Sequence, residues 1–319
     1  MPARPSPRRS TPPQRPLWLL RRCARWPARW PGGSASSPPR SRPQRARDRT
    51  EVLPAGDFGA APASYNAGMR IAVLADVHAN LPALHAVLSD ASSLGCETIW
   101  CAGDLVGRGP HPNEVVSEIR ALDVPVVQGN WDEAVGMDRA QPGVIWATPD
   151  AETEGIASLS WTGERIDDDH RSWLRQLPAN LRFTSGERSV LLFHGSPLRQ
   201  NEYLWRDRPS RTFARVAAEE SEDLLCFGHT HETFHRLVGA SHFVNAGSVG
   251  CGSPSDGRAQ YAVIDLSGEE VQVNFRAIAY DRSLVELDLE AAGLSVDLLR
   301  IPPVPHTLLD PGLESVASA

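Results

Sequence analysis

Residues 69–84 read MRIAVLADVHANLPAL, and this stretch decides the fold. Its apolar run, Ile71–Ala75, has the length and the β-branched content of a buried strand. Polar residues follow at once in ADVH. A helical stretch, Leu81–Leu94, then begins with Pro82 in its first turn and ends at Gly95. A buried strand followed directly by a helix indicates an α/β fold with parallel strands.

Four more apolar runs of this kind follow along the chain: Thr98–Cys101, Val124–Val127, Val190–Phe193 and Leu224–Phe227. A second helix is expected over residues 113–121, with Asn113 as its N-cap residue. The alternation of strand and helix predicts parallel pairing, with the helices packed on the sheet.

The rest of the folded part changes in character. Residues 133–180 are polar and helical, and a short helix is expected at Asp169–Leu177. Later segments have strand patterns and are joined by Gly- and Ser-rich turns: Phe243–Asn245, Ala259–Leu266 and Val271–Ala279. A final amphipathic helix is expected near residues 284–299. We therefore expect residues 69–319 to form one domain.

The first 68 residues differ sharply in composition from this domain. They hold 13 of the 27 prolines, and 13 arginines against three acidic residues. They carry +10 and residues 69–319 carry −17, which gives the overall −7. With little apolar surface to bury, residues 1–68 are expected to be disordered. They could be a transit peptide or a nucleic-acid-binding arm, but we favour a start codon assigned too far upstream, because Met69 opens directly onto a strand.

Cysteine content and charge limit where the protein works and what it binds. The five cysteines form no CxxC pair, which favours a reduced, cytoplasmic protein. Leu17–Leu20 is too short an apolar run for a signal peptide or a membrane span. The acidic domain argues against nucleic-acid binding by its surface. A small substrate is expected, without a membrane, and the sequence leaves oligomerisation open.

Metal-ligand residue types follow all five apolar runs. They are Asp76, His78, Asp104, Asn130, His194, His229 and His231. In an open α/β sheet the ligand crevice lies at the carboxyl ends of the strands. Each residue taken singly could be a helix cap, a turn residue or a structural histidine. These structural explanations would have to coincide at five strand ends, so we favour a shared site.

Seven oxygen and nitrogen ligands without a cysteine suit divalent Mn, Fe, Co, Ni or Zn. They are also more than one ion needs. Two ions that share a bridging carboxylate would fit this count, and such a pair activates water for attack on a phosphoester.

The segments DVH, GDLVGRG, GNWD, HG and GHTH resemble, in this order and spacing, the calcineurin-like metallophosphoesterases. The resemblance covers almost all of residues 69–280. It is closest to small bacterial members that share MRIAVLADVHANLPAL and NAGSVG. It implies a four-layer α/β/β/α sandwich with mixed sheets. It also implies one metal on Asp76, His78, Asp104 and His231, and a second on Asp104, Asn130, His194 and His229.

Arg108 lies four residues after the bridging Asp104, within GDLVGRG. It is either a surface arginine in a glycine-rich loop or a guanidinium that binds phosphate oxygens, and we favour phosphate. Its position matches the arginine of GDxVxRG in Ser/Thr protein phosphatases and diadenosine tetraphosphate hydrolases. Asn80 is expected to face the substrate, and with Asn245 and Ser248 to shape the site.

The segment GNWD differs from the pattern of the family at Trp131. Most relatives have a histidine there that protonates the leaving oxygen, and an indole has no proton to give. Loss of a general acid lowers the rate of hydrolysis least for an aryl ester or a phosphoanhydride, whose leaving groups are weak bases. Trp131 could stack on a nucleobase or aryl group, or simply pack against the helical segment. Asp132 would orient the missing histidine in relatives, so its catalytic role here is open.

The sequence thus predicts a dinuclear-metal phosphoesterase acting on small phosphate esters or nucleotides, most favourably phosphodiesters, by attack of a metal-bridging hydroxide. Diadenosine-tetraphosphatase-like or protein-phosphatase-like activity is the alternative that GDLVGRG supports. A non-catalytic scaffold is disfavoured by the intact set of seven ligands. A nuclease is disfavoured because the acidic domain shows no basic groove.

Overall fold

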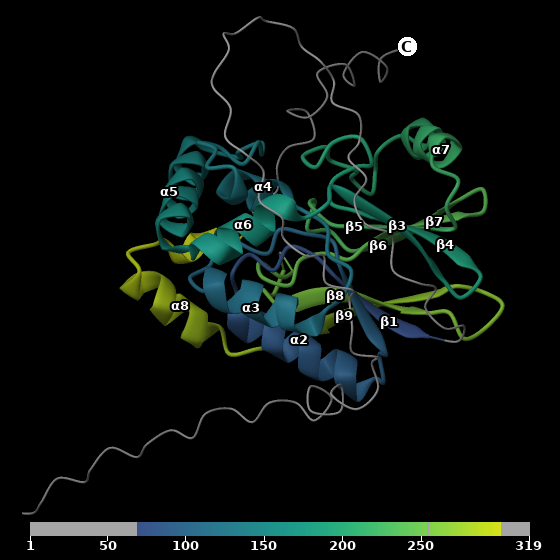
Figure 1. Ribbon diagram of the computed structural model, residues 1–319, viewed down its shortest axis with the longest axis horizontal. Coiled ribbons are helices and arrows are strands. Elements are labelled where there is room, and N and C mark those ends of the chain that lie inside the picture. The colour runs from purple at the N-terminus through teal and green to yellow at the C-terminus, as the bar shows by residue number, and fades with distance from the viewer. Residues whose placement is uncertain (1–68, 254, 301–319) are drawn as a thin grey trace, which may run out of the picture. The chain divides into compact units, whose positions relative to one another are not determined.

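The computed structural model describes residues 69–253 and 255–300 (Figure 1). The predictions made for residues 1–68, and the end of the predicted domain at residue 319, lie outside the described residues. None of the helices in the described ranges is long and apolar enough to cross a membrane.

The first sheet holds the strand that opens the domain. Its order is β2-β1-β8-β9, and β1 pairs parallel with β2 and antiparallel with β8. The strands are β1 (Arg70–Leu74), β2 (Thr98–Cys101), β8 (Ala259–Asp265) and β9 (Gln272–Ile278). The first two were predicted from their apolar runs, and the last two from the later strand patterns.

The second sheet has five strands in the order β3-β4-β5-β7-β6. Its three central strands, β4, β5 and β7, are parallel, and an antiparallel strand lies at each edge. The strands are β3 (Asn180–Ser185), β4 (Arg188–Phe193), β5 (Leu224–Phe227), β6 (Phe234–Val238) and β7 (Ser241–Asn245). Both edge strands, β3 and β6, were missed in the sequence.

The two sheets pack face to face with helices outside them, as Figure 1 shows. Ile71 and Val73 of β1 share one buried cluster with Val190 and Leu192 of β4, so alternate residues of each strand fill the space between the sheets. On the first sheet, α2 (Leu81–Ser93) packs against β8 and β9. On the second, α7 (Ser210–Glu219) packs over β6. The predicted four-layer α/β/β/α sandwich with mixed sheets is confirmed.

The remaining helices flank this sandwich. Residues 130–176 supply the helical segment expected from their polar character: α4 (Asn130–Gly136), α5 (Pro149–Arg165) and α6 (Asp168–Gln176). The others are α3 (Pro112–Leu122), α8 (Arg282–Ala291) and the 3₁₀ helix η2 (Val296–Leu299). The single final helix predicted near residues 284–299 was wrong, because the chain turns at Gly293, whose φ is +72°, between α8 and η2.

Two other predictions about local structure were wrong. Val124–Val127 is not a strand and forms only one isolated bridge, between Val126 and Cys101. Pro125 within this run has no N–H to donate to a ladder. The N-cap residue of α3 is His111 and not Asn113, whose side chain instead accepts from the Asp167 backbone N–H at 2.8 Å.

The other four apolar runs are divided between the two sheets. Thr98–Cys101 pairs with β1 in the first sheet, and β4 pairs with β5 in the second, and the parallel strands of both sheets end at the same side of the sandwich. The antiparallel strands inserted between them in the sheet order, such as β8, come from late in the chain, so local patterns could not reveal the division.

Candidate metal centre

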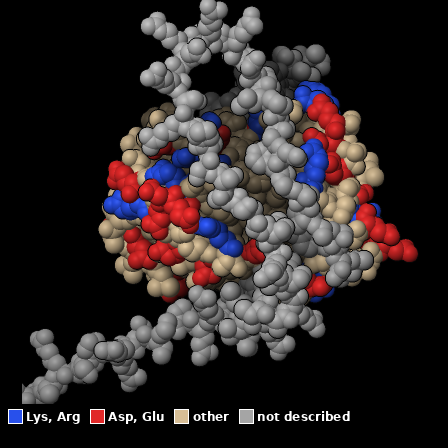
Figure 2. Space-filling model, in the orientation of Figure 1, with Lys and Arg blue, Asp and Glu red and all other residues tan. Residues whose placement is uncertain are grey.

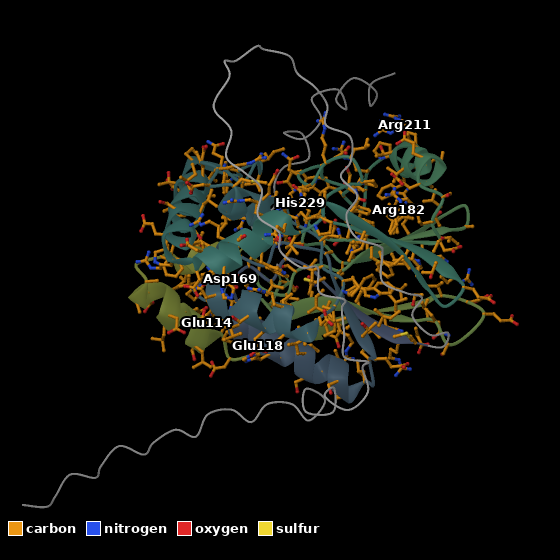
Figure 3. The ribbon with its side chains drawn as sticks, in the orientation of Figure 1. Glu114, Glu118, Asp169, Arg182, Arg211 and His229 are labelled. Atoms are coloured by element: carbon orange, nitrogen blue, oxygen red, sulfur yellow. The ribbon has the colours of Figure 1, made fainter. Side chains whose placement is uncertain are left out.

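The predicted ligand residues come together at the carboxyl ends of strands from both sheets. Asp76 and His78 follow β1, and Asp104 follows β2. From the second sheet, His194 follows β4, and the two histidines of GHTH follow β5. Asn130 opens α4. All seven side chains are buried, and Figure 3 shows His229 well inside the fold.

Hydrogen bonds between the loops fix the positions of these residues. The Asp76 N–H donates to the Gly103 carbonyl at 2.9 Å, and the His78 N–H donates to the Asp104 carbonyl at 2.9 Å. The His229 N–H donates to Asp76 Oδ2, also at 2.9 Å. The last bond joins the loops of the two sheets, so the site exists only when the sheets are packed together.

The backbone around the site is strained. Six residues of the site have positive φ angles between 46° and 66°: Asp76, His78, Asp104, Arg108, His229 and His231. This left-handed conformation is unfavourable for residues with a side chain, and it costs about 1–3 kcal/mol at each position. Such strain persists where the fold holds a residue for its function, which supports a functional site here.

Four side chains form a first group. Nε2 of His231 lies 3.1 Å from Asp76 Oδ1 and 3.2 Å from Nε2 of His78. Nε2 of His78 also lies 3.8 Å from Asp104 Oδ2. These are the spacings of atoms that could share one cation, and they match the first predicted metal position.

A second group lies on the other side of Asp104. Nε2 of His194 is 3.4 Å from Asp104 Oδ2 and 3.0 Å from Asn130 Oδ1. The ring of His229 packs against that of His194, with centroids 5.0 Å apart. Ligand atoms of Asp104, His194 and His229 all lie within 4.8 Å of one another. Asp104 therefore stands between the two groups, as a bridging carboxylate would.

Backbone carbonyls orient two of the imidazole rings. Nδ1 of His78 lies 3.3 Å from the Val106 carbonyl oxygen, and Nδ1 of His194 lies 2.7 Å from that of Ala102. A carbonyl can only accept, so each ring donates from Nδ1 and directs its Nε2 into the site. This is the orientation that a metal-binding histidine needs.

The charges of the site favour a bound cation. Burial lowers the pKa of His78 to about 3 and that of His231 well below its usual value, so these rings are neutral, as ligands must be. Burial acts the same way on His194, but the charge and the hydrogen bond of Asp104, together with Asp76, raise its pKa to about 9. The carboxylates thus strongly favour positive charge beside them.

Ligand atoms without hydrogen-bond partners, and carboxylates without enough compensating charge, also fit a site for divalent metals. Asp76 Oδ1 and His229 Nε2 are buried without a hydrogen-bond partner among the described residues. Asp76 and Asp104 are 0% and 1% exposed, and their ion pairs in the described part of the chain are all with histidines. Buried carboxylates need compensating positive charge. A carboxylate, amide and imidazole donor set suits Mn, Fe, Co, Ni or Zn.

Asp132, predicted as a catalytic residue, has a different position. Its carboxylate accepts from the backbone N–H groups of Leu105 at 2.8 Å, Val106 at 3.3 Å and Gly129 at 3.0 Å. Burial and the nearby Asp104 raise its pKa to about 7, although the N–H donors act in the opposite direction. The carboxylate holds the GDLVGRG loop to the start of α4, which favours a positioning role for Asp132. Its catalytic role stays a prediction.

We expect Asp132→Asn to lower the free energy of unfolding by about 1–3 kcal/mol, because the amide NH₂ would face backbone N–H donors and leave at least one without an acceptor. Urea unfolding of the metal-free chain would measure the change. Asp138→Asn is the matched control, since that side chain is 89% exposed just after α4. Equal stability of the two variants would contradict the positioning role.

Trp131 is enclosed within the fold. Its side chain is 1% exposed, and its ring lies edge-on to His78 and to Trp146, with centroid distances of 5.8 and 6.3 Å. A Cβ on Gly107 would come within 2.2 Å of the indole. This burial favours the alternative that Trp131 packs against the helical segment, and a contact with substrate stays a prediction.

Arg108 lies beside this tryptophan, at the edge of the ligand cluster. Its guanidinium carbon is 5.3 Å from the Trp131 ring centroid, and Nη1 donates to the Leu298 carbonyl at 3.3 Å. Its charge contributes to the lowered pKa of His78 and His231, so it lies near the metal ligands. Phosphate binding by Arg108 stays a prediction with suitable geometry.

The residues expected to shape the site have structural contacts. Asn80 caps α2 through the Ala83 N–H and donates to the Gly250 carbonyl at 2.8 Å. It is 0% exposed, which favours a structural role, and its contact with substrate stays a prediction. Asn245 donates to the Gly228 carbonyl, and Ser248 donates to the Asp76 carbonyl, so both support the ligand loops as expected.

Two residues near the ligands carried no clear signal in the sequence. Cys251 has its sulfur within 4.8 Å of ligand nitrogens of His78 and His231, and burial raises the pKa of its thiol to about 11. Tyr203, which was missed, stacks on His229 with centroids 4.1 Å apart. It belongs to an irregular segment between β4 and α7, where no periodicity or motif marks it.

Comparison with known proteins agrees with this arrangement. Residues 69–269 match the calcineurin-like phosphoesterase superfamily domain. An uncharacterised protein from Methanocaldococcus jannaschii is 30% identical over 223 residues, which cover 64% of this chain and 85% of that protein. A solved metallophosphoesterase from Sphaerobacter thermophilus is 29% identical with a TM-score of 0.56, and the match covers 73% of this chain and 97% of that one. A hypothetical protein from Pyrococcus horikoshii OT3 shares the fold, with a TM-score of 0.64 at 24% identity and coverage of 72% and 96%.

Proposed function

The chain belongs to the calcineurin-like phosphoesterase superfamily, and on this premise we propose that it hydrolyses small phosphate esters with two divalent metal ions bound to the seven ligand residues. The observation that carries the proposal is the position of Asp104, whose Oδ2 lies 3.8 Å from Nε2 of His78 and 3.4 Å from Nε2 of His194. One carboxylate between two ligand groups is what a dinuclear site requires.

The first ion would be held by Asp76, His78, Asp104 and His231, and the second by Asp104, Asn130, His194 and His229. When bound, such a pair supplies Lewis-acid polarisation of a phosphoryl oxygen and lowers the pKa of water. The protein's own residues orient the reaction. The carbonyls of Val106 and Ala102 hold two imidazoles in place, and Arg108 binds the phosphate oxygens that face the GDLVGRG loop.

Trp131 favours phosphodiesters, and among them esters of good leaving groups. The position where most relatives have a proton-donating histidine holds a buried indole, and the neighbouring Asp132 is enclosed by backbone amides. The indole has no proton to give, and the Asp132 carboxylate is engaged by three backbone N–H groups. Acid assistance is typically worth about 10²–10⁴ in rate, so its absence disfavours alkyl monoesters most. Diadenosine-tetraphosphatase-like activity on phosphoanhydrides stays the alternative.

A substrate panel with Mn²⁺ tests the proposal. We expect bis-p-nitrophenyl phosphate to be hydrolysed with a higher kcat/KM than p-nitrophenyl phosphate. Both release p-nitrophenolate, which needs no acid, but the dianionic monoester requires more positive charge from the protein than the monoanionic diester does. A preference for the monoester would contradict the phosphodiesterase assignment. No turnover with Mn, Fe, Co, Ni or Zn would favour the scaffold.

We expect Arg108→Ala to lower kcat/KM by about 10²-fold, comparable to removal of one preorganised donor to a developing charge, while metal content stays the same. Mass spectrometric metal analysis and steady-state kinetics would measure both. Arg120→Ala, which removes a surface ion pair with Asp169, is the control. Kinetics as in the wild type for Arg108→Ala would exclude the phosphate-binding role.

The cysteines and the surface charges support a proposal about the cellular location of the protein and the size of its substrate. Four free cysteines in the described residues, three of them buried, suit a reducing cytoplasm. In the part of the surface that Figure 2 leaves uncovered, acidic and basic side chains are interspersed. Both observations support a cytoplasmic enzyme that acts on small molecules.

A further inference from the structure

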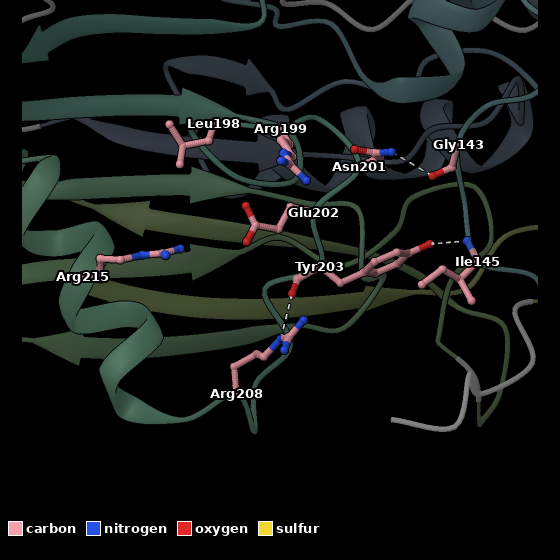
Figure 4. Close-up of a pocket in the computed structure, with 9 residues that line it drawn as sticks. All are labelled: Gly143, Ile145, Leu198, Arg199, Asn201, Glu202, Tyr203, Arg208 and Arg215. Carbon is pink, nitrogen blue, oxygen red and sulfur yellow. Dashed lines mark hydrogen bonds between the residues drawn. The ribbon is translucent and has the colours of Figure 1, made fainter. Parts of the chain in front are cut away.

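A cavity of about 500 Å³ opens beside the metal centre, in the segment between β4 and α7. We call it the arginine pocket. Figure 4 shows three arginines directed toward it from two elements, two from the loop and one from α7. They are Arg199, Arg208 and Arg215. Only one carboxylate, that of Glu202, lines it with them, so the pocket carries an excess of positive charge.

Two of these guanidinium groups have no partner among the described residues. The side chains of Arg199 and Arg215 make no hydrogen bond and no ion pair in the ranges that the structure describes, although the backbone of Arg199 is hydrogen-bonded to Ser196. Many other arginines of the described residues are ion-paired: Arg182, for example, contacts both Glu220 and Glu222. The carboxylate of Glu202 is itself engaged by the Ser196 hydroxyl at 2.6 Å. The pocket thus holds cationic donors whose hydrogen-bonding capacity is unused.

The third arginine and a tyrosine give the pocket a defined structure. Arg208 donates from Nε to the Tyr203 carbonyl at 3.3 Å, and Tyr203 Oη accepts from the Ile145 N–H at 3.2 Å (Figure 4). These contacts join the loop after β4 to the segment before α5. The pocket is therefore built by several elements and is not a single flexible turn.

The arginine pocket adjoins the second group of metal ligands. The ring of Tyr203, which lines it, stacks on His229 with centroids 4.1 Å apart. A neighbouring cavity of about 410 Å³ is lined by Asn130 and shares Gly143, Arg199 and Asn201 with the pocket. The arginine pocket and the neighbouring cavity therefore both border residues of the second ligand group or residues in contact with it.

We propose that the arginine pocket binds a second phosphate group of the substrate, beyond the one that is hydrolysed. This inference rests on the proposed phosphoesterase function and narrows its substrates to small phosphoesters with a further phosphate. A guanidinium fork matches phosphate oxygens in two parallel hydrogen bonds, and several arginines around one group add geometric specificity. A volume of about 500 Å³ lies in the range of small-molecule sites and admits a nucleoside with its phosphate.

A matched pair of chromogenic substrates tests the pocket on the metal-loaded, full-length chain. Thymidine 5′-(p-nitrophenyl phosphate) and its 3′-phosphorylated derivative have the same scissile bond and leaving group and differ only in the additional phosphate. We expect the 3′-phosphate to raise kcat/KM about tenfold or more, as charge-assisted pairing would. We expect Arg199→Gln/Arg215→Gln to abolish this advantage while the unphosphorylated substrate is hydrolysed as before.

Arg211→Gln is the control, because Arg211 lies on the same helix, α7, but does not line the pocket (Figure 3). It should keep the full advantage of the 3′-phosphate. If the wild type hydrolyses both substrates and the double variant keeps the same ratio, the pocket proposal is wrong although the phosphoesterase function stands.

A binding measurement tests phosphate binding by the pocket independently of phosphoester hydrolysis. By calorimetry, thymidine 3′,5′-bisphosphate should bind the wild-type chain at least tenfold more tightly than thymidine 5′-phosphate, and the double variant should lose this difference. If neither chromogenic substrate is hydrolysed but this pattern holds, the proposed function fails and the pocket stands. Equal binding of the two nucleotides by the wild type would overturn the pocket proposal.

Discussion

Replacement of Asp104 with Asn is expected to lower phosphodiester hydrolysis about 10³-fold, because the bridging charge between the two ligand groups is lost. Lewis-acid stabilisation is worth several kcal/mol, and each ~1.4 kcal/mol corresponds to a factor of ten in rate. Asn keeps the shape of the side chain and can still accept the Trp131 N–H, which donates to Oδ1 at 2.8 Å. The effect should therefore come from metal binding and not from the fold.

Metal content and unfolding temperature would separate these causes for Asp104→Asn. We expect fewer bound ions per chain and loss of the thermal stabilisation that metal gives to the wild type, with little change in the stability of the metal-free chain. Asp265→Asn is the control, since Asp265 pairs with Arg70 at the far end of the strands. Activity of Asp104→Asn within threefold of the wild type would contradict a bridging role.

Replacement of Trp131 with Ala is expected to lower the free energy of unfolding by about 3–5 kcal/mol, the usual cost of removing a buried aromatic side chain. The indole is 1% exposed and fills the space between His78, Trp146 and Gly107. His78 would also lose the ring that packs against its edge, so we expect weaker metal binding. Urea unfolding in chelator, followed by metal titration, would measure the two effects.

Trp173→Ala is the control for this variant, because Trp173 is only half-buried on α6, where Arg120 stacks on it. Trp173→Ala should lower the free energy of unfolding much less than Trp131→Ala does. If Trp131→Ala leaves stability unchanged and instead raises KM for aryl or nucleoside substrates, the tryptophan contacts substrate, and the packing role is wrong.

The ligand residues could be predicted because each follows an apolar run directly. DVH after Ile71–Ala75 and GHTH after Leu224–Phe227 need only strand periodicity and the rule that ligands gather at strand ends. The structure brings all seven together, although their division between two sheets could not be predicted. That division depends on β8, which comes from late in the chain and pairs with β1.

The roles of the residues around the ligands could not be predicted from local sequence. Asp132 binds three backbone amides, two of which lie 26 and 27 residues away. Arg108 is held by the carbonyl of Leu298, 190 residues further along the chain. Burial of Trp131 depends on Trp146 from the helical segment. Such contacts are decided by how distant loops pack, and no periodicity or motif encodes them.

The number of metal ions bound per chain tests the proposed centre most directly. Equilibrium dialysis of the full-length chain against Mn²⁺, followed by mass spectrometric metal analysis, would give this number. Asn130→Ala removes a ligand of the second group only and leaves Asp76, His78, Asp104 and His231 in place. We expect two ions per wild-type chain and about one in this variant; a wild-type chain that binds one ion or none at saturating Mn²⁺ would contradict the dinuclear centre.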